Sequence, residues 1–303
     1  MFGSRESSPA SAFKMCPNCR GLIERKASVC PLCGVQARPA RARGSSDAGS
    51  NRILGIIPIP GTATATLIAV NIALFGISWY LTQVAASAVA GSSPGFGSIE
   101  PGVIFRLGGK LGDLYGGSII YKGQWWRLVT ANFLHFGLIH IFMNLWCLID
   151  LGPMAESLFT KAKFVVMYLA TGVFGFFLSA WAGRGFSAGA SAAVLGLIGV
   201  LIGASFHHGR LGKDFRGQLW RWVIYIGVLG IFGPLFGLGG IDNYAHFGGL
   251  VSGLLLGYVV PDGEPNTRRE EILWDSLATI SVLIIAGSFA LMALHLNDPS
   301  PFR

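Results

Sequence analysis

Two polar side chains, Ser191 and His246, could together perform nucleophilic catalysis. Ser191 ends the triplet Gly189-Ala190-Ser191, and His246 begins a stripe of glycines at helical spacing that continues at positions 249, 253 and 257. An imidazole that accepts the proton of a neighbouring hydroxyl turns that hydroxyl into a nucleophile. The two residues lie far apart in the chain, so this chemistry requires a fold that brings them together.

His140 and Asn144 form a second candidate group. They lie four residues apart, so in a helix both side chains share one face and can point at one site. His135 precedes them in the same apolar stretch. Polar side chains at membrane depth are costly, which makes them functional candidates by default.

Seven apolar stretches must position these residues. Each contains no Asp, Glu, Lys or Arg and reaches the ~20 residues that span a hydrocarbon layer as a helix. The composition agrees, because 52% hydrophobic and 13% charged residues differ from the roughly 25% charged residues of soluble domains. We therefore expect an all-α polytopic membrane protein and not a soluble globular enzyme. The stretches are 53–99, 128–149, 164–183, 185–209, 222–241, 243–261 and 276–297.

The basic residues follow the topology that these stretches imply. The first 60 residues contain nine of them and no apolar core of a secretory signal, so the amino terminus is expected in the cytosol. Threading seven helices from there leaves 17 basic residues inside and six outside, in agreement with the positive-inside rule. This orientation explains the net charge of +8, and we expect no nucleic-acid partner.

Depth in the membrane links the candidate residues. The helices of His140, Ser191 and His246 all enter from the outer face, and each polar group lies within about two turns of entry. At ~1.5 Å per residue, all lie within roughly 10–15 Å of the outer surface. Glycines in the helices of Ser191 and His246 would allow close backbone contact. Alternatives stay open, because a lone serine often bonds its own helix, a lone histidine often only packs, and glycine stripes also pack helices without chemistry.

Four of the five cysteines form two CxxC pairs. Two such turns can direct four thiolates at one tetrahedral zinc ion, and four thiolates leave no open position for catalysis. Two disulfides are the alternative, which a reducing cytosol disfavours. We expect a small structural zinc ribbon that serves as an interaction or regulatory module. The predicted ligands are Cys16, Cys19, Cys30 and Cys33, while Cys147 is expected to be a buried apolar residue.

The ordered set of motifs over about residues 60–260 resembles the rhomboid family of intramembrane serine proteases. Each motif is weak alone, but their combined order is specific. The motifs are Trp126-Arg127, His135, His140 with Asn144, Gly152 with Glu156, Gly189 to Ser191, and Ala245-His246 with Gly249 and Gly253.

The resemblance implies a six-helix core with a Ser/His dyad in a water-filled cavity open to the outside. It implies that Ser191 attacks the scissile carbonyl, while His246 accepts its proton and later protonates the leaving amine. His140, the Asn144 amide and the Ser191 backbone N–H would hold the oxyanion. The substrates would be single-span membrane proteins within the lipid bilayer, cleaved near the outer face.

Further residues receive structural roles from the resemblance. Trp126 and Arg127 are expected to brace the long Gly-rich outer loop between residues 92 and 124, and Glu156 to belong to a hydrogen-bond network. The expected organisation is a cytosolic zinc ribbon at 1–35, a linker at 36–60, a six-helix rhomboid core at 61–261, and a cytosolic loop, seventh transmembrane helix and tail at 262–303. The seventh helix would be an addition to the family core.

Two residues depart from the family pattern. Ala192 follows the serine where the family usually has glycine, and Leu195 stands where an aromatic residue often faces the histidine. Neither change removes a chemical group, so a protease is favoured over a pseudoprotease that binds transmembrane clients, with the zinc ribbon recruiting a cytosolic protein partner. A channel or proton-coupled transporter is disfavoured, because the seven stretches contain no acidic residue.

Overall fold

The protein divides into two compact units, residues 1–56 and 57–303. In the amino-terminal unit, strand β1 (Phe13–Met15) pairs antiparallel with β2 (Leu22–Glu24), and β3 spans Arg52–Ile53. The computed structural model describes residues 13–15, 22–24, 27, 29–31, 34, 52–53, 57–58, 61–87, 95, 97–112, 123–183, 185–232 and 241–297.

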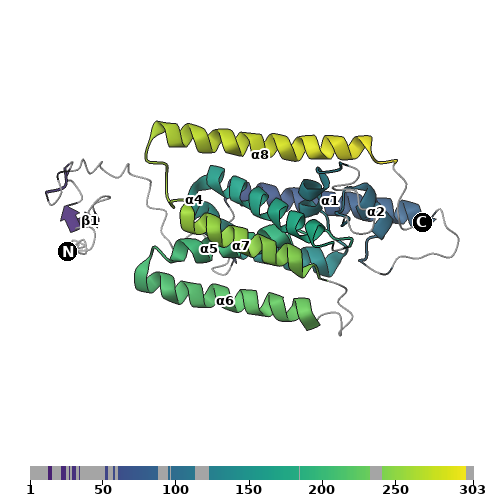
Figure 1. The fold of residues 1–303 in the computed structure, drawn as a ribbon, viewed down its shortest axis with the longest axis horizontal. Helices are drawn as coiled ribbons and strands as arrows, with labels where there is room; N and C mark the ends of the chain where they lie inside the picture. The colour runs from purple at the N-terminus through teal and green to yellow at the C-terminus, as the bar shows by residue number, and fades with distance from the viewer. Residues whose placement is uncertain are drawn as a thin grey trace, which may run out of the picture. The chain divides into compact units, whose positions relative to one another are not determined.

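The larger unit is built of helices that run side by side (Figure 1). Strand β4 (Ile57–Pro58) precedes them. The shorter helical segments in the described part of the chain are α2 (Pro101–Arg106), α3 (Arg127–Thr130) and the 3-10 turn η3 (Ala131–Phe133). The longer helices are α1 (Thr62–Ser87), α4 (Leu138–Trp181), α5 (Ser191–Ser205), α6 (Gly209–Phe232), α7 (Asn243–Val259) and α8 (Arg268–Leu294).

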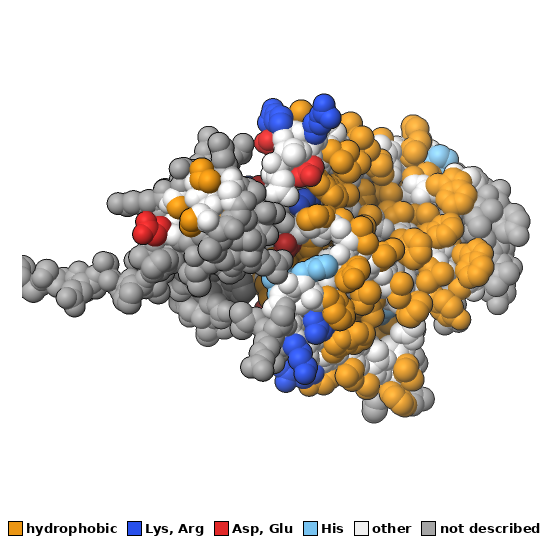
Figure 2. All heavy atoms as spheres, turned by 60° about the vertical axis from the view of Figure 1, so that its left-hand side comes forward, with side chains coloured by type: hydrophobic (Ala, Val, Ile, Leu, Met, Phe, Trp, Pro, Cys, Tyr) orange, Lys and Arg blue, Asp and Glu red, His pale blue; other side chains and the backbone are white. Residues whose placement is uncertain are grey.

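Helix α5 forms the centre of this unit. Every residue from Ala192 to Ser205 is buried, and α5 packs against α4, α6 and α7. By contrast, α8 exposes most of its apolar side chains, and in Figure 2 hydrophobic side chains cover much of the described face, with Lys and Arg at its margin. An apolar outer surface over an apolar centre is the pattern expected of a helical bundle in lipid.

Within the described residues, three helices, α1, α4 and α8, have the length and apolar composition needed to cross a membrane, and α5 is a shorter apolar helix. Helix α4 covers parts of two predicted stretches, 128–149 and 164–183. Between them its backbone breaks at Thr160, where φ is 74°. That left-handed conformation is uncommon for a β-branched residue and separates two helical segments. The number of membrane-spanning segments stays a prediction.

The predicted second helix does not begin where its apolar stretch begins. Residues 127–133 form the short segments α3 and η3, and α4 starts only at Leu138. The reason is backbone pairing with the connection between α1 and α3. Ile99 N–H donates to Phe136 O at 2.8 Å, and Leu138 N–H donates to Gly97 O at 2.8 Å. His135 therefore precedes the helix instead of lying within it.

The predicted glycine stripes form the contact between α5 and α7. A Cβ on Gly249 would overlap the carbonyl oxygen of Ala192, and one on Gly257 would overlap that of Val200. Side chains are absent at these crossing points, so the two backbones touch, as the small-residue pattern predicted. This contact fixes how the amino-terminal ends of α5 and α7 lie relative to each other.

Candidate active site

Ser191 is the first residue of α5, and it directly follows a turn that contains Gly189. Gly189 has φ of +146°, and its N–H donates to Ala131 O at 2.8 Å. The N–H of Ala190 donates to His135 Nε2 at 3.4 Å, so the buried His135 holds the turn. Val194 is bonded back to Ala190, which leaves the N–H groups of the first turn directed out of the helix end.

His246 lies in the first turn of α7 and contacts Ser191 directly. The distance between His246 Nε2 and Ser191 Oγ is 2.7 Å, within the range of a nucleophile and its base. The contact expected from the sequence is therefore present, while its role in catalysis stays a prediction. Ser252, the serine of α7, donates to Gly248 O at 2.8 Å, as a structural serine does.

His140 faces the same turn from α4. A Cβ built on Gly189 would lie 2.7 Å from His140 Nε2 and 3.5 Å from Ser191 Oγ, so only a glycine leaves space between these two groups. The N–H of Phe136 donates to His140 Nδ1 at 3.4 Å. Because Nδ1 accepts a hydrogen bond, the neutral ring has its proton on Nε2, and Nε2 is a donor directed at the space beside Ser191.

Asn144 lies one turn further along α4 and is buried. Its Nδ2 donates to His140 O at 2.8 Å, a bond within its own helix. A carboxamide nitrogen has two hydrogens, so one remains for another acceptor. The structure brings Ser191, His246 and His140 together, whereas the described contacts of Asn144 are with its own helix.

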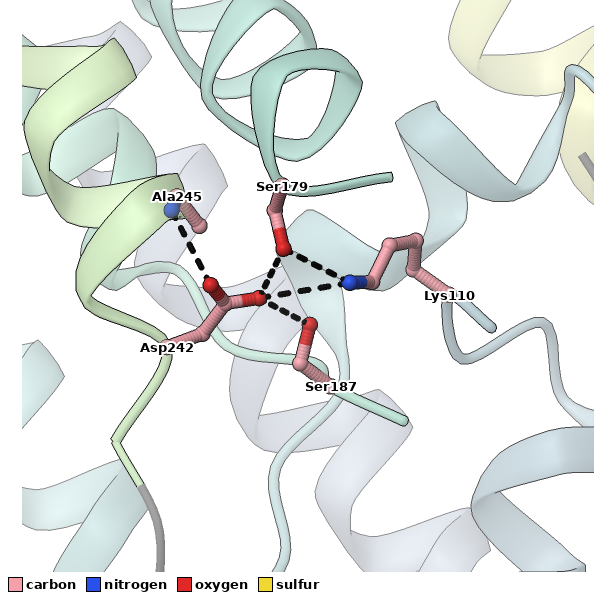
Figure 3. Close-up of polar contacts among 5 residues, drawn as sticks. All are labelled: Lys110, Ser179, Ser187, Asp242 and Ala245. Atoms are coloured by element: carbon pink, nitrogen blue, oxygen red, sulfur yellow. Dashed lines mark hydrogen bonds and ion pairs between the residues drawn. The ribbon is translucent and has the colours of Figure 1, made fainter. Parts of the chain in front are cut away.

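An ion-pair network beside the dyad was not anticipated from the sequence. Asp242, just before α7, accepts hydrogen bonds from Ser179 Oγ at 2.5 Å and Ser187 Oγ at 2.6 Å, and lies 3.3 Å from Lys110 Nζ (Figure 3). It also accepts a bond from Ala245 N–H at 3.1 Å, which caps α7. A polar residue directly before an apolar helix is the sequence signal that could have identified it.

The network sets the charge of Asp242. Burial by itself raises the pKa of its carboxyl group. The ammonium of Lys110, the hydroxyls of Ser179 and Ser187, and the Ala245 N–H outweigh burial and hold the pKa below its ordinary value. Asp242 is therefore a carboxylate over the whole neutral range.

Arg127 braces the connection between α1 and α3, as predicted. Its Nη1 donates to Phe105 O at 2.6 Å and Gly109 O at 3.0 Å, and its Nε donates to Gln124 Oε1 at 2.6 Å. The guanidinium is fully buried, 4.6 Å from the ring centre of Trp126. These bonds fold the connection against α3.

Glu156 also has the structural contacts expected of it. Its carboxylate accepts bonds from the Ala63 N–H at 3.2 Å and from the Thr64 N–H at 3.0 Å and hydroxyl at 2.8 Å. These are the first residues of α1, whose N–H groups have no partners within the helix. Glu156 therefore fastens α1 to α4.

Ala192 and Leu195, the two departures from the family pattern, have different surroundings in the structure. The methyl group of Ala192 faces α4, where a Cβ on Gly175 would lie 3.0 Å from it, so Gly175 provides the space for the methyl group. Leu195 lines a cavity of about 260 Å³ that also reaches His246. The other lining residues are Val223, Ile226, Gly227, Ile231, Asn243, Phe247 and Leu250, from α6 and α7.

Most of the predicted zinc site lies outside the described residues. This holds for Cys16, Cys19 and Cys33, while Cys30 is described and buried. The described part of the chain contains no cluster of three or more His, Cys, Asp or Glu side chains that could bind a metal ion. The zinc site therefore stays a prediction. Cys147 is buried in α4, as expected.

Comparison with known proteins shows which domain contains these residues. The model of the Rhomboid domain matches residues 122–262. These residues form a rhomboid domain. The domain includes α3 to α7 and therefore Ser191, His246, His140 and Asn144, whereas α1, α2 and α8 lie outside the match. The chain is a multi-pass helical membrane protein that contains this rhomboid domain and is homologous to rhomboid proteases.

Three relatives show the extent of the similarity. RHOMBOID-like protein 4 of Arabidopsis thaliana is 31% identical over 199 residues, which are 59% of this chain and 48% of that protein. Rhomboid protease GluP of Bacillus subtilis is 30% identical over 184 residues, 60% of this chain and 34% of its own length. Rhomboid-type serine protease 2 of Emericella nidulans is 36% identical over 183 residues, 58% and 34% of the two chains.

The matched region thus spans about half the length, or less, of each of these three relatives. In this chain the matched rhomboid domain is the part that contains the contact between Ser191 and His246.

Proposed function

We propose that this chain is an intramembrane serine endopeptidase that uses Ser191 and His246 to cleave single-span membrane proteins near the outer membrane face. The observation that supports this most directly is the 2.7 Å distance between Ser191 Oγ and His246 Nε2 within a rhomboid domain. The homologous proteins include rhomboid proteases, one of which is named a serine protease.

In the proposed reaction, His246 Nε2 accepts the proton of Ser191 as its hydroxyl attacks the scissile carbonyl. The same nitrogen then protonates the leaving amine, and a water molecule hydrolyses the acyl-enzyme by the reverse sequence. The negative charge on the carbonyl oxygen develops beside the amino-terminal end of α5, where free N–H groups and the helix dipole stabilise an anion. His140 Nε2, close to Gly189, adds a donor on the other side.

The lining of the cavity beside His246 suits an apolar side chain of the substrate. Its walls from α5, α6 and α7 are mainly aliphatic, with Asn243 and His246 as the polar lining residues. An apolar side chain of a substrate segment can occupy such a space when the segment leaves its helical form near the dyad. Small or helix-breaking residues at the cleavage site favour that unwinding.

We infer the orientation from charge. A cytosolic amino terminus satisfies the positive-inside rule at each internal connection, and it directs the beginning of α5 and α7 toward the outer face. The substrate bond would then lie close to the outer boundary of the bilayer, where water is available for hydrolysis.

We also propose that Cys16, Cys19, Cys30 and Cys33 hold a structural zinc ion in the amino-terminal unit. In the sequence, the first CxxC pair falls between the residues of β1 and those of β2, which pair antiparallel. Around the second pair, Gly34 N–H donates to Cys30 O at 2.9 Å, with φ of +72° at Gly34. A tight turn around a CxxC pair fits a zinc knuckle, which would offer a cytosolic partner protein a rigid surface.

The proteolytic function is tested with a single-span reporter co-expressed with the full chain. The wild type is expected to cleave the reporter and to react with a fluorophosphonate probe at Ser191. Ser191→Ala and His246→Ala are expected to abolish both, whereas the matched control Ser252→Ala, on α7 but bonded to its own helix, retains both. Cleavage by Ser191→Ala at the wild-type rate would overturn the proposal, and a wild type that fails to react would favour a client-binding pseudoprotease.

A further inference from the structure

Ser187 and Asp242 precede Ser191 and His246, respectively, by the same number of residues. Ser187 lies four residues before Ser191, and Asp242 lies four residues before His246. Ser187 Oγ donates to Asp242 Oδ2 at 2.6 Å. The two chain segments that lead into α5 and α7 are therefore bonded to each other directly, immediately before the residues whose spacing the proposed chemistry requires.

Lys110 adds a third chain segment to this junction. Its backbone N–H donates to Ser187 O at 2.9 Å, and the Ser187 N–H donates back to Lys110 O at 2.9 Å. Its ammonium group lies 2.7 Å from Ser179 Oγ and 3.3 Å from Asp242 Oδ2 (Figure 3). The connection after α2 and the end of α4 are thus fixed to the same carboxylate.

Asp242 also fixes the helix turn that contains His246. Its Oδ1 accepts the N–H of Ala245, and its own carbonyl accepts the N–H of His246 at 3.1 Å. One carboxylate therefore sets both the direction of the first turn of α7, through Oδ1, and its distance from the segment before α5, through Oδ2. A shift of Asp242 moves the imidazole relative to the hydroxyl.

The burial of this network favours a positional role. The Lys110 side chain is fully buried and that of Asp242 is 12% exposed. Desolvation of two charges offsets most of their attraction, so buried ion pairs are weak sources of stability. Backbone contacts between α5 and α7 already hold these helices together, whereas the network determines the placement of their ends.

We propose that Asp242, together with Lys110 and Ser187, is a positioning residue that fixes the separation of Ser191 Oγ and His246 Nε2. This inference rests on the proposed proteolytic function. Asp242 acts through α7 and through Ser187, without contact with the reacting atoms.

The test compares three variants of the full chain in detergent. Asp242→Asn retains an oxygen that can cap α7 but removes the charge, and Ser187→Ala removes a single neutral bond if the first variant folds poorly. Glu156→Gln is the matched control, because it alters a buried carboxylate that fastens α1. For each variant we measure kcat and KM for reporter cleavage, the rate of fluorophosphonate reaction at Ser191 per folded molecule, and hydrogen exchange in peptides covering 185–195 and 241–250.

A 1 Å displacement of reacting groups can cost on the order of 100-fold in rate, so we expect Asp242→Asn to lower kcat about 10- to 100-fold. KM should change much less, since the substrate cavity is lined by other residues. The rate of probe reaction should fall in parallel, and exchange should rise in both peptides. Ser187→Ala should show the same pattern at smaller amplitude, and Glu156→Gln should lower the melting temperature while keeping kcat per folded molecule.

Folded Asp242→Asn and Ser187→Ala proteins with wild-type kcat, probe reaction and exchange would overturn the positioning role. The positioning role would also be overturned if the losses of kcat and probe reaction per folded molecule were the same in these variants as in Glu156→Gln. Failure of the proposed function is distinguishable: the wild type itself would then neither cleave nor react, while the exchange measurements would still show whether Asp242 fixes the two helix starts.

Discussion

Gly253 of α7 lies against the backbone of Gly196 in α5, so closely that a Cβ on Gly253 would overlap the Gly196 carbonyl oxygen. Equivalent contacts occur one turn earlier, at Gly249, and one turn later, at Gly257. Ser191 is the first residue of α5, and His246 lies in the first turn of α7. The spacing of the helices along this glycine contact is therefore a condition for the contact between the two side chains.

Gly253→Ala should separate α5 from α7. Its methyl group meets backbone atoms, which have no room to yield, and overpacking of this kind costs about 1–3 kcal/mol of unfolding free energy. Because α7 shifts relative to Ser191, reporter cleavage per folded molecule should also fall, by about tenfold or more. Thermal unfolding in detergent and initial cleavage rates measure the two effects.

The control for this substitution is Gly287→Ala in α8. A Cβ there meets nothing within 4 Å. Alanine is favoured over glycine in a helix by roughly 0.5–1 kcal/mol, so this variant should be as stable as the wild type or more so. Wild-type stability and cleavage in Gly253→Ala would show that the helix contact tolerates expansion, contrary to the packing described above.

Removal of the donors near Ser191 should reduce kcat and leave KM nearly unchanged. If His140 and Asn144 stabilise the oxyanion, alanine at either position should cost about 10²- to 10³-fold in kcat, or roughly 3 kcal/mol. The matched control is Asn71→Ala, because Asn71 Nδ2 donates to Leu67 O within α1 as Asn144 does within α4. A purely structural Asn144 would give the same result as Asn71, with kcat per folded molecule preserved.

The sequence contained enough information for the centre of the site. Ser191 and His246 could be matched because their helices begin after charged boundaries and because glycine recurs along both. These are local patterns of side-chain size and polarity, and the contact between α5 and α7 follows from them. Arg127 and Glu156 likewise have the structural contacts that their motifs suggested.

The network of Lys110 and Asp242 could not be predicted in the same way. In the sequence Asp242 separates two apolar stretches, whereas Lys110 lies within the long Gly-rich loop, and a lysine with a flexible stem gives no sign of its partner. Their contact joins positions separated by 132 residues and depends on how the connection after α2 folds. The late start of α4 has a similar origin, because its preceding residues pair with residues 97–99 instead of continuing a helix.

The amino-terminal unit should contain one zinc ion per chain, held by the four cysteines. Purified protein should show zinc by elemental analysis, and Cys30→Ser should release it, because a thiolate ligand is lost from a site whose binding free energy is about 10–16 kcal/mol in comparable peptides. Cys147→Ser is the control, since that residue is buried in α4. Detection of two disulfides by mass spectrometry in protein purified without oxidant would contradict the zinc site.

Chelation of this zinc should leave the reaction of Ser191 with a fluorophosphonate unchanged. Four thiolates complete the coordination of a structural ion, so no position remains for substrate or water. The probe reaction is measured before and after incubation with a chelator. A loss of Ser191 reactivity on zinc removal would indicate that the ribbon regulates the protease and is more than a docking module.

Acid should weaken the fold through Asp242. The network holds the pKa of its carboxyl below the ordinary value of 3.8, so the stabilisation is fully present above that value and is lost as the pH falls through the lowered pKa of the folded state. For a single group the slope of unfolding free energy does not exceed about 1.4 kcal/mol per pH unit. Asn at position 242 has no proton to bind, so the difference in melting temperature between wild type and Asp242→Asn should shrink below about pH 4.

The comparison of melting temperatures from about pH 7 to pH 3 isolates this carboxylate from the other acidic residues. Glu271→Gln is the control, because Glu271 forms an exposed pair with Arg268 at 3.0 Å, and exposed pairs contribute little. Its melting temperature should follow that of the wild type at every pH. A difference between wild type and Asp242→Asn that stays constant down to the acid limit would mean that the charge of Asp242 does not contribute to folding, and that Lys110 is not stabilised by it.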